Sequence, residues 1–314
     1  MEGERWSFVA GTNAADPVWG HGHKHAFCHG MTEPTHVVRF YDDAMAPEPA
    51  AITPDGSGAV AVPGTRFRLL EMPEVDSTNR LLIDAMSAGE ASGLVARTDH
   101  QTAGRGRRDR TWEAPPGSGL MMSLLLEPVS GVEGLHLLAT VVGLAAVEQC
   151  RARGADVGLK WPNDVVVAAD GPPAKLAGVL AESVIAGGDV RGVVVGIGLN
   201  LRPVPGRDEA LGRRVAVLDR LVGAPVDAAQ LCRDVLGGVE RRLALLDAGD
   251  AAAVRDEVSA TSVLIGRPVE IDLDDAETVR GTVTGFDLAG NLVMDDDGGE
   301  QRVLSVGDVV TVGW

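Results

Sequence analysis

From residue 65 onward, apolar and polar residues follow patterns that are typical of short strands and longer helices. Strands are predicted at residues 66–72, 93–100, 120–128, 159–168, 174–186 and 190–201. The segment LMMSLLLEP at 120–128 is apolar almost throughout, which predicts a buried strand. The GGD sequence at 187–189 predicts a hairpin turn between the last two strands.

Segments with helical periodicity lie between some of these strands and after the last of them. Helices are predicted at residues 76–89, 134–153, 226–249 and 251–258. In the first of them, Asp76 or Ser77 is expected to cap the N-terminus, and Gly89 follows the last turn. Its inward-facing residues are expected to be Leu81, Leu82 and Met86.

The C-terminal part of the chain returns to a strand pattern. Short alternating segments between residues 264 and 312 are separated by AGN and DGG turns, which predicts a small β-barrel. The predicted fold class is therefore α+β, with a mixed sheet and helices in residues 65–260 and an all-β domain in residues 261–314.

Residues 1–64 are rich in Ala, Pro and Gly and have no sustained period. They are expected to form a flexible extension with little or no packed structure. The cluster of His21, His23, His25, Cys28 and His29 is expected to bind metal only adventitiously, because no folded frame would hold these ligands at a fixed geometry.

Composition excludes several classes of protein. The 314 residues suffice for two domains, and a net charge of -17 at pH 7 disfavours a general binder of nucleic acid or of anionic membranes. No apolar run of about 18 residues and no charged-then-apolar leader occur, which predicts a cytoplasmic protein with no membrane partner. The three cysteines lack CxxC spacing, so neither a zinc site nor a disulfide is predicted.

One short stretch reverses the overall charge: residues 100–112 read HQTAGRGRRDRTW. Gly104 and Gly106 let the backbone approach a ligand closely, and the arginines offer forked donors to phosphate or carboxylate oxygens. Trp112 offers a flat face to a base. The pattern predicts a loop that folds over a nucleotide triphosphate, and a solvated basic patch is the alternative. It is not a P-loop, because GKS or GKT is missing.

Lysine is scarce, which draws attention to the few that occur. Of 28 basic residues only three are lysine, and two of these, Lys160 in LKWPND and Lys175 in PAKLAG, lie in the region predicted to fold. The pattern indicates either chance or a site that requires a compact ammonium in place of a planar guanidinium.

Four ordered motifs, QTAGRGRRDRTW, KWPNDV, KLAGVL and GIGLN, together resemble those of the biotin protein ligases over residues 65–314. The resemblance implies a catalytic domain like that of class II aminoacyl-tRNA synthetases, followed by an SH3-like barrel. It also implies an enzyme that activates biotin with ATP and Mg²⁺ to biotinyl-5'-AMP. Biotin then passes to one lysine of the biotin carboxyl carrier domain of a carboxylase. The oligomeric state stays open, a homodimer included.

The resemblance further assigns residues to biotin. Ser77, Thr78 and Asn79 match the segment that hydrogen-bonds the biotin ring system, although a helix cap is the simpler role for Ser77. Gln101 matches a second biotin contact. The residues that match the closing loop and the lysine at the biotin carboxylate and adenylate are Arg105, Gly106, Arg107 and Lys175.

A second group of matched residues points to the nucleotide. Trp112 is expected to stack on adenine, and the remaining ATP contacts are expected from Gly104, Arg108, Arg110, Asn163 and Asn200. Catalytic roles fall to Arg107 and Lys175, which would offset the repulsion between biotin carboxylate and α-phosphate. Asp164 would orient or deprotonate the acceptor lysine. Lys160 is open between a phosphate contact and a structural role.

Two departures from the family pattern bear on these assignments. Asp109 stands where the loop GRGRRGR has its third glycine, and its carboxylate could pair with Arg108 or Arg110 and stiffen the open loop. The first 64 residues show no three-helix pattern, so the repressor activity of bifunctional family members is not expected.

Three alternatives compete with this interpretation. A lipoate–protein ligase performs the same chemistry on a related fold. A nucleic-acid-binding regulator would use GRGRRDR as its contact. An inactive scaffold would use only its C-terminal barrel, which fits poorly with an intact Lys175 and basic loop.

Overall fold

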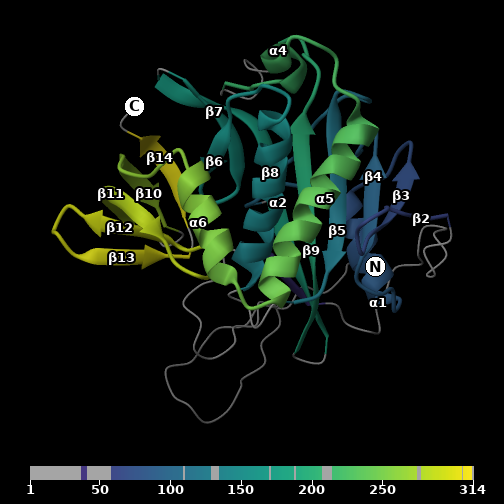
Figure 1. The fold of residues 1–314 in the computed structure, drawn as a ribbon, viewed down its shortest axis with the longest axis horizontal. Helices are drawn as coiled ribbons and strands as arrows, with labels where there is room; N and C mark the ends of the chain where they lie inside the picture. The colour runs from purple at the N-terminus through teal and green to yellow at the C-terminus, as the bar shows by residue number, and fades with distance from the viewer. Residues whose placement is uncertain are drawn as a thin grey trace, which may run out of the picture. The chain divides into compact units, whose positions relative to one another are not determined.

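The computed structural model describes residues 37–40, 58–108, 110–128, 134–169, 171–186, 189–206, 214–273, 277–305 and 307–312. Its larger sheet follows the path β2-β3-β4-β5-β9-β8-β7-β6, with β1 beside β8 (Figure 1). The pairs β3–β4 and β1–β8 are parallel, so the sheet is mixed. Its strands are β1 (Val37–Phe40), β2 (Val60–Ala61), β3 (Arg68–Met72), β4 (Leu94–Thr98), β5 (Gly119–Leu126), β6 (Gly158–Lys160), β7 (Asp164–Ala169), β8 (Gly171–Ala186) and β9 (Asp189–Asn200).

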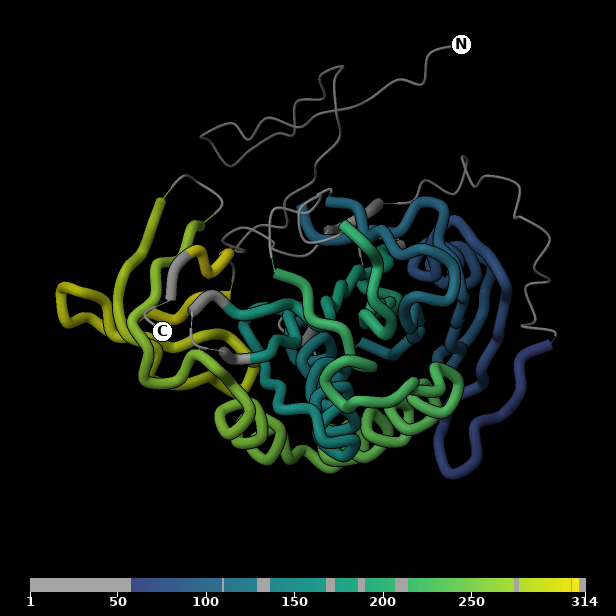
Figure 2. Tube along the Cα trace, turned by 90° about the horizontal axis from the view of Figure 1, so that it is seen from above, coloured from purple at the N-terminus to yellow at the C-terminus, as the bar shows by residue number. Residues whose placement is uncertain are grey.

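Helices cover this sheet on both faces, which explains why β5 is buried at every position. Leu124 and Leu126 belong to the main hydrophobic core, whereas Leu125 between them packs in a separate cluster with residues of α1. Helices α2, α5 and α6 lie together on the side of the main core (Figures 1 and 2). The helices are α1 (Thr78–Ser87), α2 (Gly134–Arg151), α4 (Leu218–Val222), α5 (Ala228–Asp247) and α6 (Ala251–Thr261).

Helix α1 differs in one respect from its prediction. Ser77 is the N-cap, and its side chain accepts a hydrogen bond from the backbone N of Arg80 at 3.5 Å. Leu82 is buried as expected, but Ile83 is the second buried apolar residue, whereas Leu81 and Met86 are only partly buried. The inward face was predicted from apolar residues alone. The polar residues Thr78 and Asn79 are also buried, so the buried face of α1 is centred closer to Asn79 and Ile83 than the apolar residues alone indicate.

The C-terminal residues form a separate five-stranded antiparallel sheet with the path β13-β12-β11-β10-β14. Along β11, buried Val279 and Val283 alternate with exposed residues, as expected for a sheet with one face in a core. This confirms the predicted small β domain after an α+β core. Its strands are β10 (Pro268–Asp272), β11 (Thr278–Phe286), β12 (Leu292–Asp296), β13 (Gln301–Leu304) and β14 (Asp308–Val312).

Of the segment 1–64, residues 37–40 and 58–64 belong to the described part of the chain, and both pieces contact the large sheet. Strand β1 pairs with β8 and strand β2 with β3, and Val62 is buried in the main core. The histidine cluster and Cys28 lie outside the described residues. In the described part of the chain, no helix is long and apolar enough to cross a membrane.

Candidate active site

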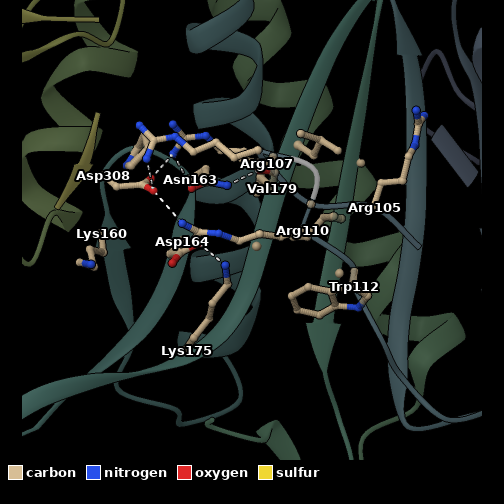
Figure 3. A pocket seen from close by; sticks show the side chains of 18 of the residues that line it. Arg105, Arg107, Arg110, Trp112, Lys160, Asn163, Asp164, Lys175, Val179 and Asp308 are labelled. Carbon is tan, nitrogen blue, oxygen red and sulfur yellow. Dashed lines mark hydrogen bonds and ion pairs between the residues drawn. The ribbon is translucent and has the colours of Figure 1, made fainter. Parts of the chain in front are cut away.

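A cavity of about 490 Å³ opens between the large sheet, the basic loop and strand β14 of the C-terminal domain (Figure 3). Its walls come from the start of α1, from β7, β8 and β9, and from the first residues of β14. The predicted site residues that line it are Ser77, Thr78, Asn79, Gln101, Arg105, Gly106, Arg107, Arg108, Arg110, Trp112, Asn163, Asp164 and Lys175. Residues that lie far apart in sequence therefore meet around one cavity.

At one end of the cavity, the first turn of α1 forms a polar network. The backbone N and Oγ1 of Thr78 donate to Gln101 Oε1 at 2.8 and 3.1 Å. Ser123 of β5 places its Oγ 2.7 Å from Thr78 Oγ1 and 2.5 Å from Asn79 Oδ1. Thr78, Asn79 and Ser123 are buried and paired within this network, so a ligand with both donor and acceptor atoms could exchange hydrogen bonds with it.

A buried carboxylate that the sequence did not reveal lies behind this network. Glu182 of β8 is 1% exposed, and its Oε2 accepts from Asn79 Nδ2 and from Arg105 Nη2, each at 2.8 Å. A Cβ on Gly196 of β9 would lie 2.0 Å from Asn79 Oδ1, so only glycine leaves room for this arrangement. Glu182 thus joins the helix terminus to the first arginine of the basic loop.

Trp112 lies against a glycine floor at the centre of the cavity. Gly178 and Gly198 are paired across β8 and β9, and a Cβ on Gly198 would come within 2.4 Å of the indole. The absence of side chains at this point lets the ring lie on the two strands. Lys175 Nζ is 5.9 Å from the ring centroid, so a flat aromatic face and a cation adjoin each other.

A β-bulge directs Lys175 into the cavity. Val165 pairs with Ala177, but Val166 pairs with Lys175, so Leu176 is an extra residue on β8. Ala177 and Leu176 both enter the core, whereas Lys175 lies on the cavity side with Val166. Without the bulge, the alternation along β8 would send Lys175 to the core side.

Lys175 forms a close ion pair at the rim of this cavity. Its Nζ lies 2.5 Å from Asp164 Oδ1, a contact close enough for strong attraction but not aligned as a hydrogen bond. Asp164 begins β7 directly after the turn at 161–163, where the Trp161–Pro162 peptide bond is cis. The two predicted catalytic residues Lys175 and Asp164 therefore neutralise each other (Figure 3).

The arginines at the tip of the loop converge on Asp308 of β14. Arg107 Nη1 lies 3.2 Å from its Oδ1, while Arg108 Nη1 and Arg110 Nη2 each lie 2.9 Å from its Oδ2. Arg107 Nη1 also donates to Asn163 Oδ1 at 3.3 Å. Arg105 lies on the other side of the cavity from Asp308 (Figure 3). Sequence reasoning missed Asp308, because a single aspartate in a β domain carries no signal of its own.

Lys160 also reaches toward the C-terminal domain. Its Nζ donates to the backbone O of Val309 at 2.8 Å and lines the cavity. Burial lowers the pKa of Lys160 below its ordinary value of 10.5, partly offset by the charge of Asp164. Both roles that the sequence left open for Lys160 thus remain compatible with its position.

Two predicted ATP contacts do not line the cavity. Gly104 lies against the backbone of Trp112: its carbonyl oxygen accepts from Trp112 N at 3.0 Å, and a Cβ there would lie 2.3 Å from the Trp112 carbonyl oxygen. Asn200 is buried, and its Nδ2 donates to the backbone O of Lys175 at 3.3 Å. Both residues support the positions of cavity residues, and their contacts with a nucleotide stay predictions. Asp109 lies outside the described residues.

The amino-acid sequence matches two family profiles and several proteins of known name. A profile of the biotin/lipoate A/B protein ligase family matches residues 72–200, and one of the biotin protein ligase C-terminal domain matches residues 264–311. The biotin–[acetyl-CoA-carboxylase] ligase of Mycobacterium tuberculosis is 33% identical over 254 residues, which cover 79% of this chain and 90% of that protein. The chain belongs to the biotin protein ligase family.

Further relatives agree with this assignment. The bifunctional ligase/repressor BirA of Escherichia coli is 31% identical over 229 residues, covering 72% of this chain and 69% of that protein. The structure of the Aquifex aeolicus biotin protein ligase in complex with biotin and ATP superposes with a TM-score of 0.65 at 25% identity, covering 78% and 98% of the two chains. In this chain, all residues predicted for the biotin and ATP site lie within the first profile match, at residues 72–200. Asp308 lies within the second, at residues 264–311.

Proposed function

We propose that this protein activates biotin with ATP to biotinyl-5'-AMP and transfers biotin to a lysine of a biotin carboxyl carrier domain of a carboxylase. Membership of the family and the named activity of its M. tuberculosis relative support this function. The observation that carries it is a single cavity that combines a buried polar network, a lysine, three clustered arginines and the partly buried indole of Trp112.

The first step brings two anions together, the biotin carboxylate and the α-phosphate of ATP. Lys175 and Arg107 would offset their repulsion, and more so as negative charge accumulates on the transferred phosphate oxygens. The carboxylate oxygen attacks phosphorus, the bond to the β-phosphate breaks, and pyrophosphate leaves. Residues of the basic loop would then keep water from the mixed anhydride.

The second step requires a neutral acceptor lysine. Its amine attacks the acyl carbon, AMP leaves, and one proton must be lost from the nitrogen. Asp164 is the carboxylate of the cavity that lies beside Lys175, where the acyl phosphate would be held. In this proposal Asp164 exchanges its partner, from Lys175 to the incoming amine, and orients or deprotonates it.

Magnesium would arrive with the nucleotide. Among the described residues, no three His, Cys, Asp or Glu side chains are grouped so that they could hold a metal ion. Mg²⁺ keeps several waters and binds mainly phosphate oxygens with one or two carboxylates, so a preformed cage is not needed. The carboxylate that fits this role is Asp164, and the metal would supply neutralisation of the leaving pyrophosphate.

The buried polar network favours biotin over lipoate. The ureido ring of biotin has one carbonyl and two N–H groups, which can satisfy hydroxyl and amide groups such as those of Thr78, Ser123 and Gln101. A dithiolane ring has no amide or carbonyl group, so it would gain none of these hydrogen bonds from the polar network.

The test is a pair of reactions with the full chain. Biotin or lipoate is mixed with MgATP, and pyrophosphate release is followed. A purified biotin carboxyl carrier domain is then added and weighed by mass spectrometry. The proposal expects biotin-dependent pyrophosphate release and a carrier heavier by one biotinyl group. Release with lipoate alone would favour a lipoate ligase, and salt-sensitive duplex binding without either reaction would favour the nucleic-acid regulator.

A further inference from the structure

Residues 307–309 connect the C-terminal domain to the basic side of the cavity. The carbonyl oxygen of Gly307 accepts from Arg107 Nη2 at 3.3 Å, and that of Val309 accepts from Lys160 Nζ at 2.8 Å. Gly307 has a φ of 146°, and a Cβ there would lie 2.5 Å from Ile271 Cγ2. A glycine is therefore required immediately before Asp308 for this segment to take its path.

The carboxylate of Asp308 sits between three guanidinium groups. The side chains of Arg107, Arg108 and Arg110 are 12%, 35% and 62% exposed, and that of Asp308 is 24% exposed. Three like charges this close repel one another, and partial burial weakens the screening by water. Asp308 supplies the negative charge that holds the three arginines together.

The contacts with Asp308 occupy only part of each guanidinium. The ion pairs of Arg108 and Arg110 each use one terminal nitrogen, whereas a guanidinium has five N–H donors. Arg107 is held more fully, because its Nη1 also contacts Asn163 and its Nη2 contacts Gly307. An arginine can therefore bind a carboxylate and a phosphate at the same time. The contacts to Asp308 fix the side chains near the cavity before any phosphate enters.

The charge of the cavity fits this arrangement. Among its described lining residues, seven are basic and only Asp164, Asp272 and Asp308 are acidic. The positive excess persists with Asp308 in place, so this carboxylate does not cancel the attraction for a polyphosphate. Its effect is on the positions of the arginines.

We propose that Asp308 is a positioning residue of the C-terminal domain that arranges Arg107, Arg108 and Arg110 to receive the phosphates of ATP. The inference rests on the proposed function, since it assumes that the nucleotide binds in this cavity. Ordering three long side chains in advance removes an entropic cost from binding. Asp308 thereby increases nucleotide affinity, although it is itself an anion.

The test compares Asp308→Asn with the unchanged enzyme in biotin-dependent pyrophosphate release. We expect KM for ATP to rise by about tenfold, the effect of losing one favourable charged contact. We expect kcat at saturating ATP to stay within about twofold, because Lys175 is unchanged and the bound phosphates themselves then order the arginines. Asp308→Glu should recover most of the affinity. Asp295→Asn, which removes an exposed carboxylate of the same domain, is the control and should leave KM unchanged.

A double-mutant cycle shows whether Asp308 acts through the arginines. In the Arg108→Gln, Arg110→Gln background, adding Asp308→Asn should change KM for ATP much less than it does alone. The melting temperature of each variant identifies any that fail to fold, and Asp308→Glu then carries the comparison. An unchanged or lowered KM for ATP in folded Asp308→Asn would overturn the inference. An unchanged enzyme that releases no pyrophosphate with biotin would instead overturn the proposed function.

Discussion

Lys175 and Asp164 face each other across strands β7 and β8, with Nζ 2.5 Å from Oδ1. The two residues were expected to act in different steps, Lys175 on the carboxylate and phosphate and Asp164 on the acceptor amine. Their contact links these steps. When the biotin carboxylate or the α-phosphate binds Lys175, Asp164 loses its cationic partner. Asp164 is then available to the acceptor amine, which must bind beside it in the second step.

Lys175→Arg is expected to lower the rate of biotinyl-adenylate formation by about two orders of magnitude, as the loss of a charge-stabilising contact does. Nζ lies so close to Gly178 that a Cβ there would come within 2.9 Å of it, and it is 5.9 Å from the Trp112 ring centroid. The wider guanidinium of arginine would therefore have to displace the indole or leave the position of the ammonium. Single-turnover formation of the adenylate measures the effect. Lys175→Met, which keeps an unbranched side chain but no charge, should be impaired to a similar degree. Near-normal turnover by Lys175→Arg would show that Lys175 is peripheral.

Gly198→Ala is expected to weaken ATP binding, because the new methyl group would come within 2.4 Å of the Trp112 indole. The indole would then have to move off Gly178 and Gly198, and it could no longer offer its face to adenine in the proposed position. KM for ATP should rise by about tenfold or more, the loss of roughly one aromatic contact with its packing. Gly285→Ala is the matched control, since a Cβ there has nothing within 4 Å. Equal KM values for both variants would remove Trp112 from the nucleotide site.

The order and type of most elements could be predicted because each has a clear period, and the motifs between them mark the loops. Contacts between distant segments were less accessible. The buried Glu182 occupies a polar position in a strand that reads as apolar, and it became important only when β8 placed it behind Asn79. The role of Asp308 became visible only in the structure, because its contact with Arg107 depends on how the catalytic and C-terminal domains pack together. The bulge at Leu176 was equally hidden, because a strand sequence does not reveal which residue lacks a partner.

Stability is expected to fall as the pH drops below about 6.5, partly through His136. Burial lowers the pKa of His136 below its ordinary value of 6.5, and its Nε2 contacts the backbone O of Ser305. Below 6.5 the unfolded chain therefore binds a proton that the folded chain does not, so the free energy of unfolding decreases with falling pH until the folded pKa is passed. The slope contributed by one such group reaches about 1.4 kcal/mol per pH unit.

Denaturant unfolding between pH 7.5 and 5 tests this expectation. The curve of His136→Gln should be shallower than that of the unchanged protein, because glutamine does not titrate. If both proteins lose stability with the same slope, His136 is not the group responsible.

Deletion of the N-terminal residues is expected to leave biotinyl-adenylate formation near that of the full chain. All predicted site residues lie after position 76. Because β2 pairs with β3 and Val62 is buried, the shortened protein should begin at Gly58 and not later. A second truncation, beginning at Thr35, retains β1 and shows what its pairing with β8 contributes. A folded protein beginning at Gly58 that makes no adenylate would refute this expectation.

Arg107→Gly is expected to release the intermediate more than it slows its formation. Arg107 contacts Asn163, Gly307 and Asp308, so it joins the loop to both the catalytic and the C-terminal domain. If it also holds the acyl phosphate, one charge-assisted hydrogen bond of about 1.5–3 kcal/mol is lost, which weakens retention by about one to two decades. Adenylate formation should persist in part, because Arg105 and Lys175 still line the cavity in which the two anions would react.

The leak can be measured as biotin attached to lysines of an unrelated protein in the same tube. Protease digestion of the loop, with and without biotin and ATP, tests the closure on which the prediction depends. A loop that closes over its ligands should be cut more slowly when they are present, and Arg107→Gly should lose part of this protection. Equal cleavage in both states, together with no release of adenylate by the variant, would mean that another segment retains the intermediate.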